Sequence, residues 1–270
     1  MGMDEQGFLS PDTESVIKQI RGRYPHHFRQ FDRIHRLCHE IKYKLHIQTH
    51  DGQQVFSAGL FMKLLEDIEG AIVLIERGMS VPARSLLRVA IECLITLANM
   101  KDDPAFAQAF AIVGERQRLK LFRGLSAETF ASIDGLDRQA VNDLVKQLQS
   151  ITSGSPNKNI EQWAKNAGLS YLYEVPYRLL CSPSYSDPYF LERSYFKGNE
   201  RGKLEGFLWG PFRNDDMSGL LIECIRLLIY GANYVGEVFK LDVAKTTQQY
   251  DDEMRQLNET CLSVVDAVQF

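Results

Sequence analysis

Three charged residues lie at intervals of four in an otherwise apolar stretch of the sequence. In SVPARSLLRVAIECLITLANM, Arg84, Arg88 and Glu92 share one edge of a helix that turns by ~100° per residue. A helix that is apolar on nearly all sides lies inside its bundle, where an ion needs a partner to offset its desolvation. One interpretation is a structural pair of Arg88 with Glu92, joined by Glu66 or Glu69 from the preceding helix. The other is a polar pocket in which Arg84 and Arg88 bind an anion or a nucleotide.

Histidines form a second unusual pattern. All six lie between positions 12 and 50, and His35, His39, His46 and His50 follow one another at helical angles. Pairs of histidines four apart suit metal ligation on a helix, but no acid or cysteine interleaves with them. We therefore expect surface histidines and no metal ligand, while a metal at one pair, or catalysis or RNA contact by His35 or His39, remain as alternatives.

Three stretches together carry a resemblance to a known family: GAIVLIERGMSVPARSLLRVAIECLITL, GERQRLKLF and YLYEVPYRLLCSPSYSD. Over residues 55 to 190 the chain resembles a bacterial all-helical family of unknown function that occurs in genomes and mobile elements. That family has an Arg-x-x-x-Glu helix and a later Tyr-x-x-Leu-Ser-x-x-x-His segment. Arg88 and Glu92 fit the first motif, whereas Cys181 and Tyr185 stand where the family has Ser and His.

The resemblance extends distantly to the HEPN class of small helical ribonucleases, whose motif is Arg-x(4–6)-His. Arg33 with His39 matches this spacing, as does Arg29 with His35. Arg33 and His39 are therefore the catalytic candidates of a metal-independent ribonuclease. The histidine of the family's later segment is absent here, so this chain lacks that acid or base.

Aromatic and basic residues alternate between positions 181 and 214, where no helical period persists. Aromatic platforms beside cations suit the binding of single-stranded nucleic acid or peptide, although a surface loop can also pack its own aromatic side chains. The candidate binding residues of the chain are Arg84, Arg88, Glu92, Tyr185, Arg193 and Trp209.

Apolar residues recur with a helical period along most of the chain, and Ser-Pro or Asp-Pro pairs precede several of the periodic segments. The sequence predicts an all-α protein, an irregular multi-helix bundle with a long aromatic-rich loop near residues 181–214. We expect one domain over 1–270, with a weak boundary near 151–159. The expected helices cover residues 11–21, 26–48, 54–77, 81–100, 103–123, 126–133, 136–150, 160–167, 169–181, 216–239 and 247–268.

The composition is that of a globular protein without a membrane span. The 270 residues are 44% hydrophobic and 24% charged, and the net charge of −4 argues against a surface that coats nucleic acid. The N-terminus has no hydrophobic signal region, so we expect a cytoplasmic protein. The five cysteines are far apart and predict reduced thiols. We expect no cofactor.

The C-terminal segment predicts an amphipathic helix, since its apolar residues are spaced alternately four and three apart. These residues are Tyr250, Met254, Leu257, Cys261, Val264 and Val268. This seam can dock on the chain's own bundle or on a second copy, and we expect a homodimer. For function we expect a non-enzymatic helical binding or regulatory protein in a bacterial defence or mobile-element setting, with a protein or RNA partner. The alternative is the HEPN-like ribonuclease or toxin.

Overall fold

The protein is all-α, as predicted, apart from a small two-stranded sheet. The computed structural model describes residues 6–124, 138–154, 159–185, 188–198, 203–211 and 217–268. The long helices are α2 (Thr13–Arg23), α3 (Pro25–Lys44), α4 (Gly52–Glu76), α5 (Ser80–Asp102), α6 (Phe106–Arg123), α8 (Arg138–Thr152), α13 (Met217–Phe239) and α14 (Ala244–Val268). The short elements are the 3₁₀ turn η1 (Gly7–Leu9), α9 (Ile160–Asn166), α10 (Ser170–Leu172), the π-helix η2 (Tyr173–Tyr177), α11 (Arg178–Tyr185), α12 (Pro188–Tyr195), β1 (Phe196–Gly198) and β2 (Leu204–Phe207).

The core of the bundle surrounds α13, which packs against α3, α4, α5 and α14. Its apolar residues are buried on most sides, as are those of α5. Cys38, Cys93 and Cys224 are buried in this core as free thiols, as the sequence predicts. Gly231 lets α13 approach α4 closely, because a β-carbon at this position would collide with the side chain of Leu64.

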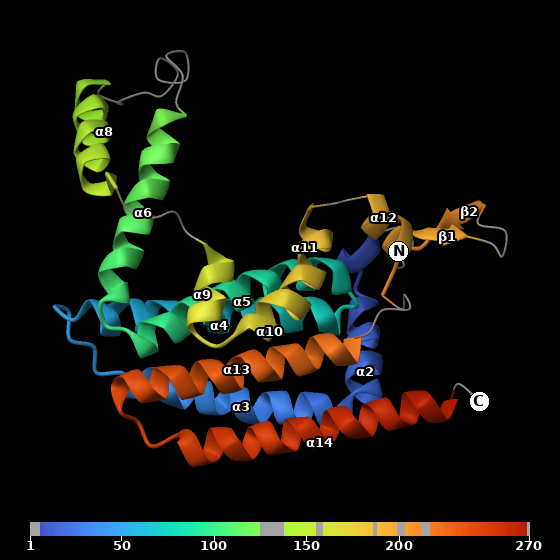
Figure 1. The fold of residues 1–270 in the computed structure, drawn as a ribbon. Coiled ribbons are helices and arrows are strands. Elements are labelled where there is room, and N and C mark those ends of the chain that lie inside the picture. Colours follow the sequence, from blue (N-terminus) through green and yellow to red (C-terminus); the bar gives the residue numbers. More distant parts are fainter. Residues whose placement is uncertain are drawn as a thin grey trace.

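Two parts of the chain project from the bundle. Helices α6 and α8 pack together as an arm that rises from one end of the bundle (Figure 1). The antiparallel hairpin β1–β2 lies toward the other end, beyond α12. The short helices α9, α10 and α11 cover α5 between these two projections.

The structure corrects two of the predicted elements. Helix α3 ends at Lys44, where Leu45 takes an extended conformation, so His46 and His50 are not on the helix and the four-histidine stripe does not exist. The segment 181–214 is not a continuous irregular loop, because α11 runs to Tyr185 and is followed by α12 and the hairpin. The helix predicted over 126–133 lies outside the described residues.

The first half of α14 docks on the chain's own bundle. Met254 is 3% exposed, and Gln30 of α3 donates a hydrogen bond of 3.0 Å to the carbonyl oxygen of Tyr250. Arg33 of α3 pairs with Glu253 and lies over the ring of Tyr250. The side chains of the second half of the seam lie outside the described residues, and homodimerisation stays a prediction.

Helix α13 is long and apolar enough to cross a membrane by length and composition alone. However, 72% of its most apolar window is buried inside the protein. The apolar character of α13 is therefore explained by its place in the core of the bundle.

We predict that Gly231→Val destabilises the protein by roughly 1–3 kcal/mol, because the added methyl groups overpack the contact between α13 and α4. Gly59→Ala is the matched control, since Gly59 is an exposed glycine of α4 and an added β-carbon would meet no neighbouring atom within 4 Å. This change should stabilise the helix by about 0.5–1 kcal/mol. Chemical denaturation measures both values, and equal effects of the two substitutions would contradict the close packing at Gly231.

Candidate functional site

A network of polar side chains joins α5 to the segment η2–α11. Arg88 and Glu92 form an ion pair on α5, with 3.0 Å between Nη2 and Oε1. Arg88 also donates from Nη2 to the hydroxyl of Tyr177 at 3.0 Å, and Tyr177 donates to Oε1 of Glu92 at 2.9 Å. The Nε of Arg88 contacts the Sγ of Cys181 at 3.4 Å. The predicted Arg88–Glu92 pair is therefore present, and two residues of the later family-like segment complete it.

The network is electrically neutral as a whole. The side chains of Arg88 and Glu92 are each 19% exposed, and Tyr177 is 8% exposed. Burial alone would lower the pKa of Arg88, but the hydrogen bonds with Cys181 and Tyr177 and the charge of Glu92 raise it. Burial and the hydrogen bond to Glu92 raise the pKa of Tyr177, so its hydroxyl keeps its proton. Since Glu92 compensates Arg88, this pair has no excess positive charge for an anion.

A π-helical turn sets the direction of Tyr177. Pro176 lies inside η2 and cannot donate the backbone hydrogen bond of a regular helix. The helix widens over Tyr173–Tyr177, and Tyr177 then points toward α5 with Cys181 one turn later. Single π-helical turns of this kind are frequent at functional sites.

Tyr177 also lines a cleft of about 690 Å³ between α6, α9 and η2. Phe106 of α6, Trp163 of α9 and Tyr173 of η2 contribute further aromatic walls. Phe106 and Trp163 meet edge to face, with ring centroids 5.0 Å apart, and Tyr173 stacks on Tyr177 at 5.1 Å. The volume is within the usual range of pockets that bind small molecules or side chains.

Hydrogen bonds at the base of α9 hold the cleft in place. Asn99, near the end of α5, donates to the carbonyl oxygen of Trp163 at 2.9 Å. Asn159 caps the N-terminus of α9 by accepting from the backbone N–H of Gln162 at 3.0 Å. Glu161, a carboxylate of the cleft wall, pairs with Lys165 at 2.7 Å. The cleft is therefore aromatic, and its acidic group is compensated.

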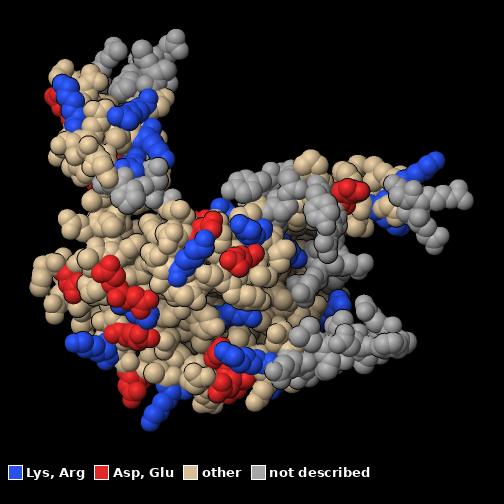
Figure 2. All heavy atoms as spheres, in the orientation of Figure 1, with Lys and Arg blue, Asp and Glu red and all other residues tan. Residues whose placement is uncertain are grey.

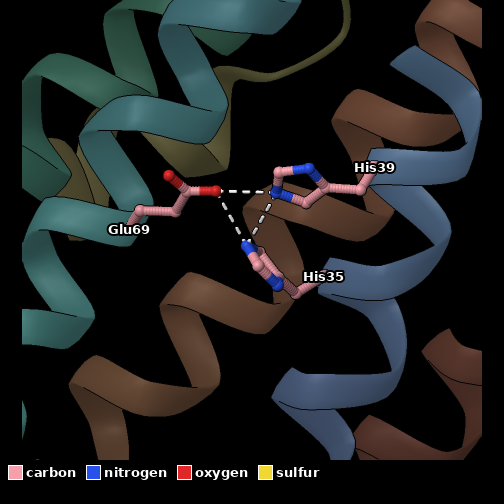
Figure 3. A group of neighbouring side chains, drawn as sticks. All are labelled: His35, His39 and Glu69. Carbon is pink, nitrogen blue, oxygen red and sulfur yellow. Dashed lines mark hydrogen bonds and ion pairs between the residues drawn. The ribbon is translucent and has the colours of Figure 1, made fainter. Parts of the chain in front are cut away.

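A second cluster lies between α3 and α4 and contains His35, His39 and Glu69 (Figure 3). Nε2 of each histidine is 2.8 Å from Oε1 of Glu69, and the two Nε2 atoms are 3.0 Å apart. Burial would raise the pKa of Glu69, but the hydrogen bonds and charges of His35 and His39 outweigh it and lower the pKa. From the sequence, Glu69 was considered only as a partner for Arg88. In the structure, its carboxylate contacts His35 and His39.

The side chains of the two ribonuclease candidates, Arg33 and His39, contact different helices. Arg33 points to α14, where its Nη1 is 2.5 Å from Oε2 of Glu253. His39 points to α4 and Glu69. Arg33 and His39 therefore have separate partners in the described structure.

The other predicted binding residues are dispersed. Arg84 lies half-buried on α5, one turn before Arg88, and has no ion-pair partner within the described part of the chain. Tyr185 ends α11 and Arg193 lies in α12, and their side chains are outside the described set. Trp209 follows β2, is 56% exposed and packs on Phe8 at a centroid distance of 5.2 Å.

Two features of the site were not predicted from the sequence. The role of Tyr177 is the first, although its spacing of four from Cys181 is a signal that could have placed both residues on one helix face. The aromatic cleft is the second, because Phe106, Trp163 and Tyr173 come from segments that are distant in sequence. No local spacing links such residues.

A family model described as "Family of unknown function (DUF5677)" matches residues 54–203. This range is more than half of the chain, so the protein belongs to this family. The range contains the Arg88–Glu92–Tyr177–Cys181 network and the aromatic cleft, whereas His35 and His39 precede it. No curated protein and no solved structure matches the chain.

We predict that Glu92→Leu destabilises the fold by about 3 kcal/mol, near the lower end for breaking a buried ion pair. Arg88 would keep its charge while losing its carboxylate partner at 19% exposure. Asp143→Leu is the control, because its pair with Lys146 is 3.5 Å long and well exposed and should change stability by less than about 0.5 kcal/mol. Thermal and urea unfolding measure both variants. Equal melting temperatures for Glu92→Leu and the wild type would contradict the role of the pair.

Proposed function

We propose that this member of the DUF5677 family is a non-enzymatic binding protein whose cleft between α6, α9 and η2 receives an aromatic side chain of a partner protein. The observation that carries the proposal is the position of Tyr177. Its ring lines the cleft, while its hydroxyl bonds both Arg88 and Glu92. The wall of the cleft is thus anchored to the central helix and is preorganised for binding.

The walls of the cleft favour an uncharged, planar group. Aromatic rings pair with one another edge to face or offset, and Phe106, Trp163, Tyr173 and Tyr177 offer such surfaces. The charges at the cleft are already compensated, since Glu161 pairs with Lys165 and Arg88 with Glu92. A phosphate would gain little there, because the described residues that line the cleft include no lysine or arginine.

The exposed side chains of the segment that carries Tyr173 and Tyr177 favour a protein over a nucleic acid. Tyr171, Val175 and Leu179 follow one another at intervals of four along α10, η2 and α11, and they are 68%, 40% and 68% exposed. Exposed apolar groups of this kind are typical of protein contact surfaces. Figure 2 shows Lys and Arg side chains interspersed with Asp and Glu on the drawn face of the bundle, whereas Lys and Arg predominate on the arm of α6 and α8. A strong nucleic-acid contact depends on a continuous basic surface, and the described lining of the cleft contains no lysine or arginine.

The polar network suits a structural and binding role better than a catalytic one. Tyr177 keeps its proton because its pKa is raised, and Arg88 is bound to three neighbouring side chains. The ribonuclease alternative has less support, since Arg33 and His39 point to different helices. A role in defence or in a mobile element stays a prediction of the sequence.

We predict that N-acetyl-tyrosinamide binds in the cleft and quenches the fluorescence of Trp163. The chain has two tryptophans, so a Trp209→Phe background leaves Trp163 as the only reporter. A ligand of this size reaches a Kd of about 1 mM or slightly lower. The titration should saturate at millimolar ligand. Excitation at the red edge of tryptophan absorption avoids absorption by the tyrosine ligand.

Variants of the same background locate the binding. Phe106→Ala should weaken binding at least about fivefold, because it removes one aromatic wall. Tyr43→Ala, at an 80% exposed position on α3, should leave the affinity unchanged. A titration that does not saturate, or an equal loss in both variants, would exclude the cleft. Tighter binding of adenosine monophosphate than of the tyrosine amide would indicate a nucleic-acid ligand instead.

A further inference from the structure

The histidine cluster presents three electron-pair donors to one point. His35 and His39 lie one turn apart on α3, and Glu69 faces them from α4. In Figure 3 both rings and the carboxylate point toward one another. The three contacts between Nε2 of His35, Nε2 of His39 and Oε1 of Glu69 measure 2.8, 2.8 and 3.0 Å.

Protons cannot satisfy all three of these contacts at once. A carboxylate only accepts, so each histidine must carry its proton on Nε2 to bond Glu69. The contact between the two Nε2 atoms then brings two donors together at 3.0 Å. If one ring loses that proton to accept from the other, it no longer donates to Glu69. A cation removes the conflict, because all three atoms can offer it a lone pair.

From this geometry we propose that His35, His39 and Glu69 form a binding site for a divalent transition-metal cation, with zinc as the representative ion. Two imidazoles and one carboxylate are a donor set that zinc and its neighbours in the first transition series accept. Ligand atoms around a tetrahedral zinc lie roughly 3.3 Å apart. The observed triangle needs to open by only a few tenths of an ångström, which side-chain rotation can supply.

The exposure of the cluster suits an open site rather than a closed structural one. The side chains of His35, His39 and Glu69 are 30%, 34% and 41% exposed, so an ion can enter from solvent. Three protein ligands leave at least one coordination position for water or a substrate, as in catalytic zinc sites.

The contact of Lys42 with His39 disfavours metal binding in the present arrangement. Its Nζ lies 3.1 Å from Nδ1 of His39, which requires an acceptor at Nδ1. A neutral histidine that binds metal through Nε2 carries its proton on Nδ1 and needs an acceptor beside it. Lys42 must therefore move away when the ion binds, and a neutral acceptor in its place should strengthen binding.

The test is calorimetric titration of ZnCl2 into the metal-stripped full-length protein, with CoCl2 absorption as a second measurement. We expect one ion per chain, and no heat from MgCl2. The His35→Ala/His39→Ala variant should lose this binding. The His46→Ala/His50→Ala variant should keep it, because this pair has the same spacing but lies beyond the end of α3. Absence of zinc binding in the wild type, or wild-type affinity after loss of His35 and His39, would overturn the site.

Two single substitutions keep the test decisive if the double histidine variant does not fold. Glu69→Gln preserves the size of the side chain. It should lower the affinity for zinc at least about tenfold, because an anionic ligand is lost. Lys42→Gln should increase the affinity for zinc about tenfold. The amide oxygen of the new side chain can accept a hydrogen bond from Nδ1 of His39, and acceptors of this kind strengthen metal binding by histidine. At the same zinc concentration, the melting temperature should rise more for the wild type than for Glu69→Gln, because stabilisation by a ligand falls as its Kd increases. Unchanged affinity in Glu69→Gln, or equal or weaker affinity in Lys42→Gln, would contradict the proposed coordination.

Discussion

The compensation of the Arg88 charge inside the bundle is the constraint on which the described site depends. Helix α5 lies beneath other helices, and an ion on such a helix needs partners because desolvation is costly. Glu92 provides one partner from the same helix, while Tyr177 and Cys181 provide two more from η2 and α11. These contacts hold η2 and α11 across α5 in one orientation. The same orientation makes the ring of Tyr177 a wall of the cleft, so an electrostatic requirement of the core shapes a feature of the surface.

Helix α3 makes polar contacts with two different helices, α14 and α4. Arg33 holds α14 through Glu253 and the ring of Tyr250, while His35 and His39 meet Glu69 of α4. The cleft and the polar network lie within the range that matches the family model. Two ligands of the proposed metal site precede that range. The third ligand, Glu69, lies inside it.

Much of the helical structure could be predicted from the sequence. The apolar period of α5 and α13 and the proline-containing starts of helices are local signals, and they placed most of the long helices within a few residues. The hairpin β1–β2 was not predicted, because its strands are only three and four residues long and their pairing carries no period that can be read over so few positions. The end of α3 at Lys44 was also missed, and the stripe of four histidines was a consequence of extending that helix too far.

Spacing within single helices was enough to establish the all-α class, the central place of α5 and the Arg88–Glu92 pair, since residues four apart on a helix are neighbours. The partners that come from elsewhere in the chain could be known only from the folded structure. Folding brought Tyr177 to Arg88 across 89 positions, Glu69 to His39 across 30, and Arg33 to Glu253 across 220. Such contacts depend on how helices pack and rotate against one another, and helix packing is set by the whole complementary surface rather than by any local spacing.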